Sequence, residues 1–448
     1  SNINGRSVIG IICGQNYTGT VSNCDVSDIS ISAVGSAGGI VGSNNGVIEA
    51  CTSTTASGKE ISTTSANAGG IAGVAFGGKI SNSSSTAVVN STNGDNIGGI
   101  VGWVNSNSSD NEITDCHHNT GKVSGRSSVG GLIGRTDKVS ISYCDSSNEV
   151  ISTSQYTGGL IGYASDVIIL NCSSAAKVQG SQFTGGLLGF LESTGSISKV
   201  NIDNCNHNGD SVTGKSQVGG LIGFINNNSS TEINVKDCYS TSNVSSTGNY
   251  TGGLVGLVSS PADKPAVKIT SCYHLTGSVT GINNVGGFIG AVGKAEITGT
   301  TYADCDVTGN ECVGGLIGNY SGGTNVTLKI TGTSDSPESY IKTSGQVSGT
   351  TYVGGLIGKS ENGLTAQYCS SLSKVVSKTS NQNNYFGGLI GYMKEGYVEE
   401  CNSTGIVSAD TIASTGGLIG FCANSHVAKC YHSENNVLGH FNADRKSV

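Results

Sequence analysis

The residues best suited to bind a metal ion surround a cysteine in the first third of the chain. Asp115, Cys116, His117 and His118 are consecutive, and carboxylate, thiolate and imidazole groups are the usual protein ligands of zinc. Four of the seven histidines occupy the second position after a cysteine, namely His118, His207, His274 and His432. This pattern indicates a Cys/His metal site as one candidate function.

The spacing of the histidines argues against a shared metal site. They belong to a repeating unit of the chain, and the next histidine in the slot of His118 is His207, three units further along. Stacked strands would separate the two by ~14 Å, whereas zinc holds its ligands within about 2.3 Å of one point. We therefore predict no metal and no cofactor. Asp115, His117 and His118 are the candidate ligands if this prediction fails.

Paired carboxylates are a second candidate, because polysaccharide lyases and hydrolases need converging acidic groups. The candidate pairs are Asp304 with Asp306 and Glu399 with Glu400. Neighbouring strand residues point to opposite faces, so we expect Glu399 and Glu400 not to act together. Asp304 and Asp306 fit a corner residue and an outward residue of the repeat. Since His-Glu-x-x-His is also absent, we predict that the chain is not an enzyme.

Cysteine is frequent enough, at fifteen residues, for a disulfide framework to be considered. Twelve cysteines, from Cys24 to Cys430, fall at the same position of the repeat. In-register side chains of neighbouring strands lie ~4.8 Å apart, farther than the ~3.8 Å between Cβ atoms in a relaxed disulfide. We predict a buried, mostly reduced column. Cys13, Cys312 and Cys422 lie outside it, so local pairing stays open for these three.

The elements that position all these residues come from the repeat itself. The motif Gly-Gly-x-x-Gly occurs thirteen times, with starts 27 to 40 residues apart, and a degenerate copy lies at 9–13. A period of this size predicts a solenoid in which each unit packs only against its neighbours. The strict copies begin at Gly38, Gly69, Gly98, Gly130, Gly158, Gly185, Gly219, Gly252, Gly286, Gly314, Gly354, Gly387 and Gly416.

The unit at 218–250 indicates how one rung is built. Val218–Ile225 is expected as a first strand, Asn226–Ser230 as a loop and Glu232–Lys236 as a second strand. A third strand begins at Cys238, with small residues inside and polar residues outside. The residue before the cysteine predicts a tight left-handed corner and a ladder of stacked amides, because six units have Asn or Asp there: Asn23, Asp115, Asn171, Asn204, Asp237 and Asp304.

These patterns predict an all-β fold, a right-handed parallel β-helix of about 14 rungs. We expect three short strands per rung and a single solenoid over residues 1–448. The net charge of −8 and the scattered Lys and Arg residues disfavour nucleic acid as a partner. No apolar run approaches the ~20 residues of a membrane span, so we predict no membrane insertion. The chain starts at Ser1 without Met, so we expect a removed leader or a fragment.

The repeat resembles a known family. Gly158-Gly159-Leu160-Ile161-Gly162, followed by Cys172-Ser173, is similar to the GLUG repeat, and the resemblance extends from about Ile9 to His432. GLUG repeats occur in secreted or surface-attached adhesin-like proteins and in non-catalytic regions of some IgA-cleaving metallopeptidases. The resemblance implies an extracellular β-solenoid scaffold and transfers no catalytic residue. Two units depart from the pattern: one has Ser83 in place of the cysteine, and the one starting at Gly314 lacks it.

Variable loops after the glycine motif are the expected binding face of such a solenoid. They are Asn226–Ser230 (with Asn226, Asn227 and Asn228), Ser259–Lys264 and Thr333–Gly349. The outward Tyr239 and Tyr273 could stack on sugars, although tyrosine is also an ordinary strand residue. We predict a secreted or cell-surface scaffold or adhesin-like stalk that binds a glycan or a host protein. The alternative is a structural subunit that self-associates end to end into an extracellular filament, because uncapped rungs expose backbone N–H and C=O groups.

Overall fold

The computed structural model describes residues 2–105, 111–322, 328–334, 340–378, 384–409, 413–433 and 437–439. The regular elements in these ranges are β-strands, and they pair in parallel within three sheets. Successive turns of the chain, about 13 in number, stack to form a right-handed parallel β-helix. This confirms the predicted fold class.

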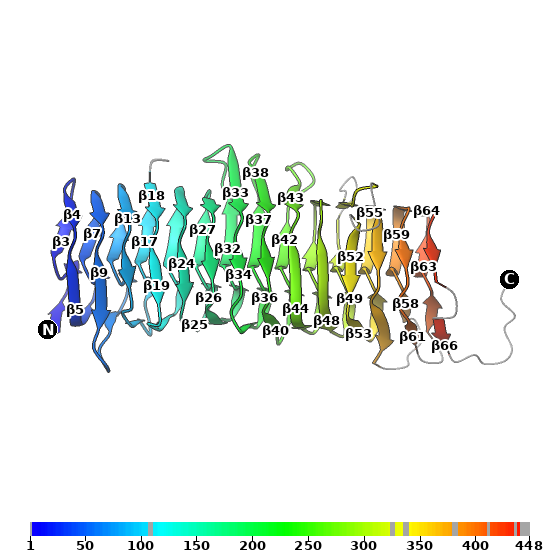
Figure 1. Ribbon diagram of the computed structural model, residues 1–448, viewed down its shortest axis with the longest axis horizontal. Coiled ribbons are helices and arrows are strands. Elements are labelled where there is room, and N and C mark those ends of the chain that lie inside the picture. Colours follow the sequence, from blue (N-terminus) through cyan, green and yellow to red (C-terminus); the bar gives the residue numbers. More distant parts are fainter. Residues whose placement is uncertain are drawn as a thin grey trace, which may run out of the picture. The chain divides into compact units, whose positions relative to one another are not determined.

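The chain divides into two compact units. Unit 1 comprises Ser1–Lys215 and Gly220–Asn234, and unit 2 comprises Ser216–Gly219 and Val235–Val448. Within the described ranges each unit contains seven strands of the sheet that leads into the glycine motif; Figure 1 labels β26 and β36 among them. In unit 1 these are β2 (Ile9–Gly10), β6 (Ala37–Gly38), β11 (Ala68–Gly69), β16 (Asp95–Gly98), β21 (Ser127–Gly130), β26 (Gln155–Gly158) and β31 (Gln182–Gly185). In unit 2 they are β36 (Ser216–Gly219), β41 (Asn249–Gly252), β45 (Asn283–Gly286), β49 (Glu311–Gly314), β54 (Thr351–Gly354), β58 (Tyr385–Gly387) and β62 (Ser414–Gly416).

One turn of unit 1 illustrates how a rung crosses all three sheets. After β21, the chain enters the second sheet with β22 (Ile133–Asp137) and β23 (Val139–Ser142). It then enters the third sheet with β24 (Asp145–Ser147) and β25 (Glu149–Ser152). Three faces per rung agree with the prediction, but the expected continuous strand Val218–Ile225 is wrong. There β36 ends at Gly219 and β37 (Ile222–Asn227) begins after a two-residue bend.

The glycine motif is this bend, and backbone packing explains its composition. A Cβ atom on Gly130 would lie 1.9 Å from the carbonyl oxygen of Ile133, and one on Gly131 would lie 2.0 Å from that of Gly159 in the next rung. No side chain fits at such distances, so only glycine allows this approach. Leu132, between the motif glycines, is completely buried and anchors the corner in the core.

In-register pairing stacks each core residue on its equivalent in the next rung. Ile133 pairs with Ile161, and Ile161 pairs with Leu188; all three side chains are fully buried. Burying one such side chain contributes roughly 1.5–3 kcal/mol. The stability of each unit therefore accumulates from contacts between neighbouring rungs.

The corner before the cysteine column has the predicted left-handed conformation. Asn23, Asp115, Asn171, Asn204 and Asp237 have φ between 51° and 54°. The predicted amide ladder is present where the side-chain nitrogen of Asn204 donates to the side-chain oxygen of Asn171 at 2.7 Å. The corner does not require Asn or Asp, since Ala50 and Tyr143 adopt the same conformation.

The prediction for Asp304 is wrong, and with it the place of Cys305 in the column. Asp304 lies inside β48 (Tyr302–Thr308) rather than at a corner. Tyr302 pairs with Tyr273, so Thr301 fills the slot that Cys272 occupies in the preceding rung. Eleven cysteines rather than twelve therefore share the column position: Cys24, Cys51, Cys116, Cys144, Cys172, Cys205, Cys238, Cys272, Cys369, Cys401 and Cys430.

Candidate functional site

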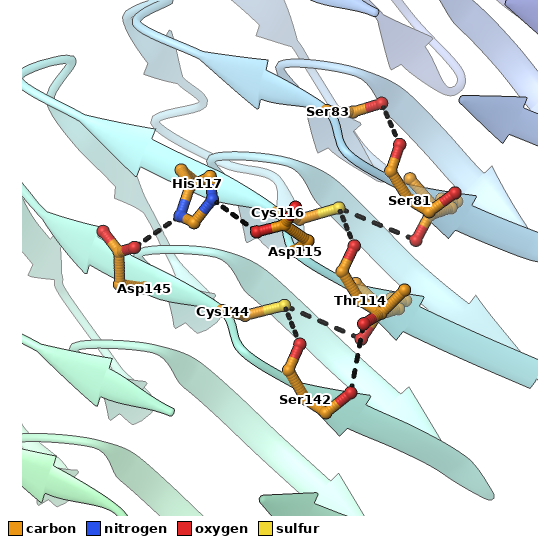
Figure 2. A network of polar contacts seen from close by, with 11 residues as sticks. Ser81, Ser83, Thr114, Asp115, Cys116, His117, Ser142, Cys144 and Asp145 are labelled. Carbon is orange, nitrogen blue, oxygen red and sulfur yellow. Dashed lines mark hydrogen bonds and ion pairs between the residues drawn. The ribbon is translucent and has the colours of Figure 1, made fainter. Parts of the chain in front are cut away.

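A polar surface cluster centres on His117, the first residue of β19 (His117–Asn119). The left-handed corner at Asp115 directs that carboxylate towards the imidazole, with 3.1 Å between its Oδ1 and Nε2 of His117. On the other side, Nδ1 of His117 hydrogen-bonds Oδ1 of Asp145, which is its pairing partner in the next rung. Figure 2 shows the ring held between the two carboxylates.

The electrostatics of this cluster favour a charged histidine. Partial burial by itself lowers the pKa of His117, but the hydrogen bonds and charges of Asp145 and then Asp115 more than offset it and raise the pKa above its usual value. Both ring nitrogens face carboxylate oxygens, so neither offers a lone pair to a metal ion. In the described ranges no three His, Cys, Asp or Glu side chains are grouped as a metal would require.

His118 does not join this cluster, although the sequence placed it among the candidate ligands. Its side chain is completely buried on the opposite face of β19, and its Nε2 lies 2.9 Å from the carbonyl oxygen of Gly121. A Cβ on Gly99 would lie 2.2 Å from Cγ of the ring, so the second motif glycine makes room for the histidine. Burial lowers the pKa of His118 to about 4.

Asp145 is the residue that sequence reasoning missed. It follows Cys144 just as His117 follows Cys116, so the repeat alignment contains the signal that the two side chains meet on adjacent rungs. The structure therefore replaces the predicted trio of Asp115, His117 and His118 with Asp115, His117 and Asp145. His117 contacts Asp115 in its own rung and Asp145 in the next one, so the cluster is suited to linking two neighbouring rungs.

Directly beneath His117, the cysteines form the predicted inward column. The thiol of Cys116 donates to the carbonyl oxygen of Thr114 at 3.4 Å, and that of Cys144 donates to Ser142 at 3.2 Å. Ser83 takes the same place one rung earlier and donates to Ser81 at 2.8 Å, as Figure 2 shows. The structure has all fifteen cysteines as thiols, Cys13, Cys312 and Cys422 included, and the reduced state of the column stays a prediction.

Tyr239 and Tyr273, the candidate sugar-stacking residues, stack on each other, as the alternative of ordinary strand residues implies. The ring centroids of Tyr239 and Tyr273 are 5.1 Å apart, and those of Tyr273 and Tyr302 are 5.0 Å apart, with interplanar angles of 6° and 5°. Both faces of Tyr273 are therefore covered by aromatic rings. A sugar that stacks on an aromatic face would need one of these faces open.

A larger aromatic cluster in unit 1 is similarly closed. Tyr163 stacks on Phe190 with centroids 5.3 Å apart, and their exposed fractions are 9% and 7%. The guanidinium of Arg135 lies 4.3 Å from the centroid of Tyr163, and the Tyr163 hydroxyl donates to Glu192. The low exposure indicates that these rings stabilise a corner of the solenoid.

The loop predicted at Asn226–Ser230 is shorter in the structure, because Asn226 and Asn227 belong to β37. Asn226 donates to a carboxylate oxygen of Glu192 at 3.2 Å, and the side chain of Asn227 is buried. Only Asn228 of the three predicted ligand residues is exposed.

The other two predicted loops are also partly strand. Ser259 ends β42 (Val255–Ser259), so that loop covers 260–266. In the predicted insertion Thr333–Gly349, residues 335–339 lie outside the described ranges. Its later part forms β52 (Ile341–Ser344) and β53 (Gln346–Gly349).

The candidate carboxylate pairs are engaged by neighbouring rungs. Asp304 accepts a hydrogen bond from the Ser344 hydroxyl at 2.6 Å, and Asp306 accepts one from the backbone N–H of Gln346 at 2.8 Å. Each contact uses one oxygen, Oδ1, of its carboxylate and links it to the next rung.

The expectation that Glu399 and Glu400 cannot act together is wrong. Both reach the ammonium of Lys429, at 3.1 and 2.9 Å, because Glu400 is a left-handed corner residue with φ 52°. Hydrogen bonds from Tyr397, Lys429 and Gln367 lower the pKa of Glu399 to about 2. This group is therefore ionised at neutral pH and is poorly suited to donate a proton.

Comparison with known proteins gives no relative from which to transfer a function: no family model, no curated protein and no solved structure matches the chain. The described part of the chain also has no helix with the length and apolar character needed to cross a membrane.

Proposed function

We propose that this chain is a non-catalytic scaffold of the cell surface or extracellular space, and that it binds a neutral glycan through loops at one corner. The observation that carries the proposal is the tolerance of that corner to insertions. Lys138 alone connects β22 to β23, whereas residues 194–198 connect β32 (Leu188–Ser193) to β33 (Lys199–Asp203). The longer connection is visible at the upper edge of Figure 1.

The insertion leaves the pairing of its flanking strands unchanged. Ala164 pairs with Leu191 before the loop, and Ile169 pairs with Ile202 after it. The β-helix therefore supports loops of different length without loss of register, as expected of a scaffold that presents binding loops.

The corner loops of unit 1, defined as residues 194–198 and 228–231, are held in one conformation. The buried carboxylate of Asp166 accepts hydrogen bonds from the backbone N–H groups of Thr194 at 3.0 Å and Ser196 at 3.1 Å. The Thr231 hydroxyl donates to the carbonyl oxygen of Ile197 at 2.8 Å, which joins the two loops. Such pre-organisation reduces the entropy lost on binding.

The chemistry of the corner loops supports a neutral glycan as the ligand. Thr194, Ser196, Asn228 and Ser230 are exposed, and they carry hydroxyl and amide groups with no formal charge. The Thr194 hydroxyl already donates to Asp166 and contacts the Ser196 hydroxyl at 3.1 Å, so Asn228 and Ser230 are the more available of the four. The engagement of the described carboxylate pairs by neighbouring rungs supports a binding role over a catalytic one.

A glycan array read with the full chain and a loop-shortened variant tests the proposal. In the variant, a single lysine replaces residues 194–198, as in the β22–β23 connection. We expect binding to at least one neutral glycan, at least a tenfold loss of it in the variant, and no loss for Lys177→Ala, an exposed position on β30 (Lys177–Gln179). Absence of glycan binding, or equal binding by the loop-shortened variant, would overturn the proposal.

A further inference from the structure

Four successive rungs of unit 1 place a cysteine at the same point. The residues that follow Cys116, Cys144, Cys172 and Cys205 pair with one another in sequence: His117 with Asp145, Asp145 with Ser173, and Ser173 with Asn206. The four side chains are at most 1% exposed. We call these four residues the thiol column.

All four sulfurs of the thiol column have the same orientation. Each thiol donates to the carbonyl oxygen two residues earlier in its own rung, at 3.4, 3.2, 3.3 and 3.2 Å in chain order. Cys116, Cys144 and Cys205 also reach a carbonyl oxygen of the preceding rung at 3.6 Å. Because the backbone fixes each rotamer, neighbouring sulfurs are separated by about the strand spacing, ~4.8 Å.

This spacing is unsuited to a disulfide but matches a bridging metal ion. A disulfide needs sulfurs ~2.05 Å apart and Cβ atoms ~3.8 Å apart. A zinc–sulfur bond is about 2.3 Å long, and two bonds of that length on opposite sides of one ion span about 4.6 Å. An ion with two collinear ligands therefore fits between neighbouring thiols with little backbone movement.

We propose that the thiol column binds soft monovalent metal ions, copper(I) or silver(I), with one ion between each pair of neighbouring sulfurs. Thiolates select soft ions of this class. Two-coordinate binding requires only two thiols per ion. It is thus compatible with the absence, among the described residues, of any group of three or more His, Cys, Asp or Glu side chains placed to hold a metal.

The charge of the filled column balances. Each ion that enters between two sulfurs displaces one thiol proton to the solvent, and no electron is transferred. Three ions along four cysteines leave three thiolates and one thiol, so the core carries no net charge and avoids the cost of burying one.

Ser83 provides an internal interruption of the pattern. Pairing of Asp25 with Thr52, Thr52 with Ser84, and Ser84 with His117 places Ser83 between Cys51 and Cys116. A hydroxyl does not bind soft ions as a thiolate does. The thiol column is thus separated from the pair Cys24–Cys51, and the number of bridging positions can be raised or lowered by single substitutions.

The experiment adds silver(I), and separately copper(I) without oxygen, to the full chain and measures bound ions per chain by elemental mass spectrometry after desalting. Cys144→Ser removes two bridging positions and should lose two ions relative to wild type. Ser83→Cys creates two positions and should gain two. Cys422→Ser is the matched control, because Cys422 is exposed and lies outside the column.

X-ray absorption of the bound silver should show two sulfur neighbours. Serine already fills the column slot at Ser83, so Cys144→Ser is expected to fold, and circular dichroism checks this. The proposal is overturned if Ser83→Cys gains no ions, or if Cys144→Ser loses no more ions than Cys422→Ser. Ions that depend only on Cys422 would be surface binding and would also overturn it.

Discussion

His117 and His118 are adjacent in sequence, yet they lie in opposite environments of one rung. His117 faces outward between two carboxylates, and its pKa is raised; His118 faces inward against Gly99, and its pKa is lowered to about 4. The alternation of a β-strand alone produces this difference. The comparison teaches that residue type says little about chemistry in this fold until the face of the strand is known.

The same contrast extends along the two rows to which these histidines belong. The inward row of His118 contains Ser85 and Ser146 in the neighbouring rungs, and the motif glycines leave space only for small residues or a flat ring. The outward row of His117 contains Ser84 and Asp145, where side chains vary and pair with one another. Substitutions on the inward side should therefore cost far more than those on the outward side.

The largest effect is expected for Gly131→Ala at the inward corner. The new Cβ would lie 2.0 Å from the carbonyl oxygen of Gly159, so the neighbouring rung must move, at a cost of about 4 kcal/mol or more. Gly14→Ala is the control, because its Cβ would meet only one atom at 3.8 Å. Chemical unfolding of both variants measures the difference, and equal midpoints would contradict the packing explanation of the motif.

The next effect is a pH dependence that arises from His118. Its pKa is about 4 in the folded chain and about 6.5 when unfolded, so the unfolded state binds more protons between these values. The free energy of unfolding is therefore unaffected by His118 above pH 6.5 and decreases as the pH falls. The decrease reaches about 3 kcal/mol at and below pH 4.

His118→Ser isolates this contribution, since Ser85 and Ser146 already occupy the equivalent positions. The variant should lose less free energy of unfolding than wild type between pH 7.5 and pH 4. Denaturant unfolding at several pH values, without added metal, provides the measurement. Parallel profiles for the two proteins would exclude His118 as the source.

A smaller effect of opposite sign is expected for His117→Gln. Because the pKa of His117 is raised on folding, its contribution is present below the unfolded value and is lost as the pH rises through the folded pKa. An ion pair this exposed contributes at most about 1 kcal/mol and weakens with salt. Unfolding at pH 6 in low and high salt should show a difference between variant and wild type only in low salt.

The smallest effect is expected for Asn204→Ala in the corner ladder. The substitution removes the hydrogen bond to Asn171 but leaves a residue that the same corner accepts at Ala50, with φ 50°. We expect a loss of about 1 kcal/mol or less. A loss comparable to that of Gly131→Ala would show that the amide ladder, and not the glycine corner, sets the register.

The sequence was sufficient to predict features that depend on local conformation and period. The β-helix follows from the spacing of the glycine motif, and the left-handed corners follow from Asn and Asp before the cysteine. The position of the glycine bend was mispredicted, because Val218–Ile225 is apolar throughout and hydrophobicity alone cannot place a break within such a run.

Features that depend on pairing between rungs were less predictable. The shift that removes Asp304 from the corner and Cys305 from the column is set by the pairing of Tyr302 with Tyr273. The partnership of His117 with Asp145 and the convergence of Glu399 and Glu400 on Lys429 likewise arise from contacts across rungs. A single unit read alone does not contain this information.

The exact matching of rungs has a consequence for how such a chain can change its length. Thr157 and Gly158 pair with Thr184 and Gly185, so deletion of residues 158–184 would join Thr157 directly to Gly185 and recreate the same dipeptide at the junction. Every strand on either side would find an equivalent partner one turn away. A gene that encodes this chain could therefore gain or lose a whole turn in one recombination event and still specify a folded product.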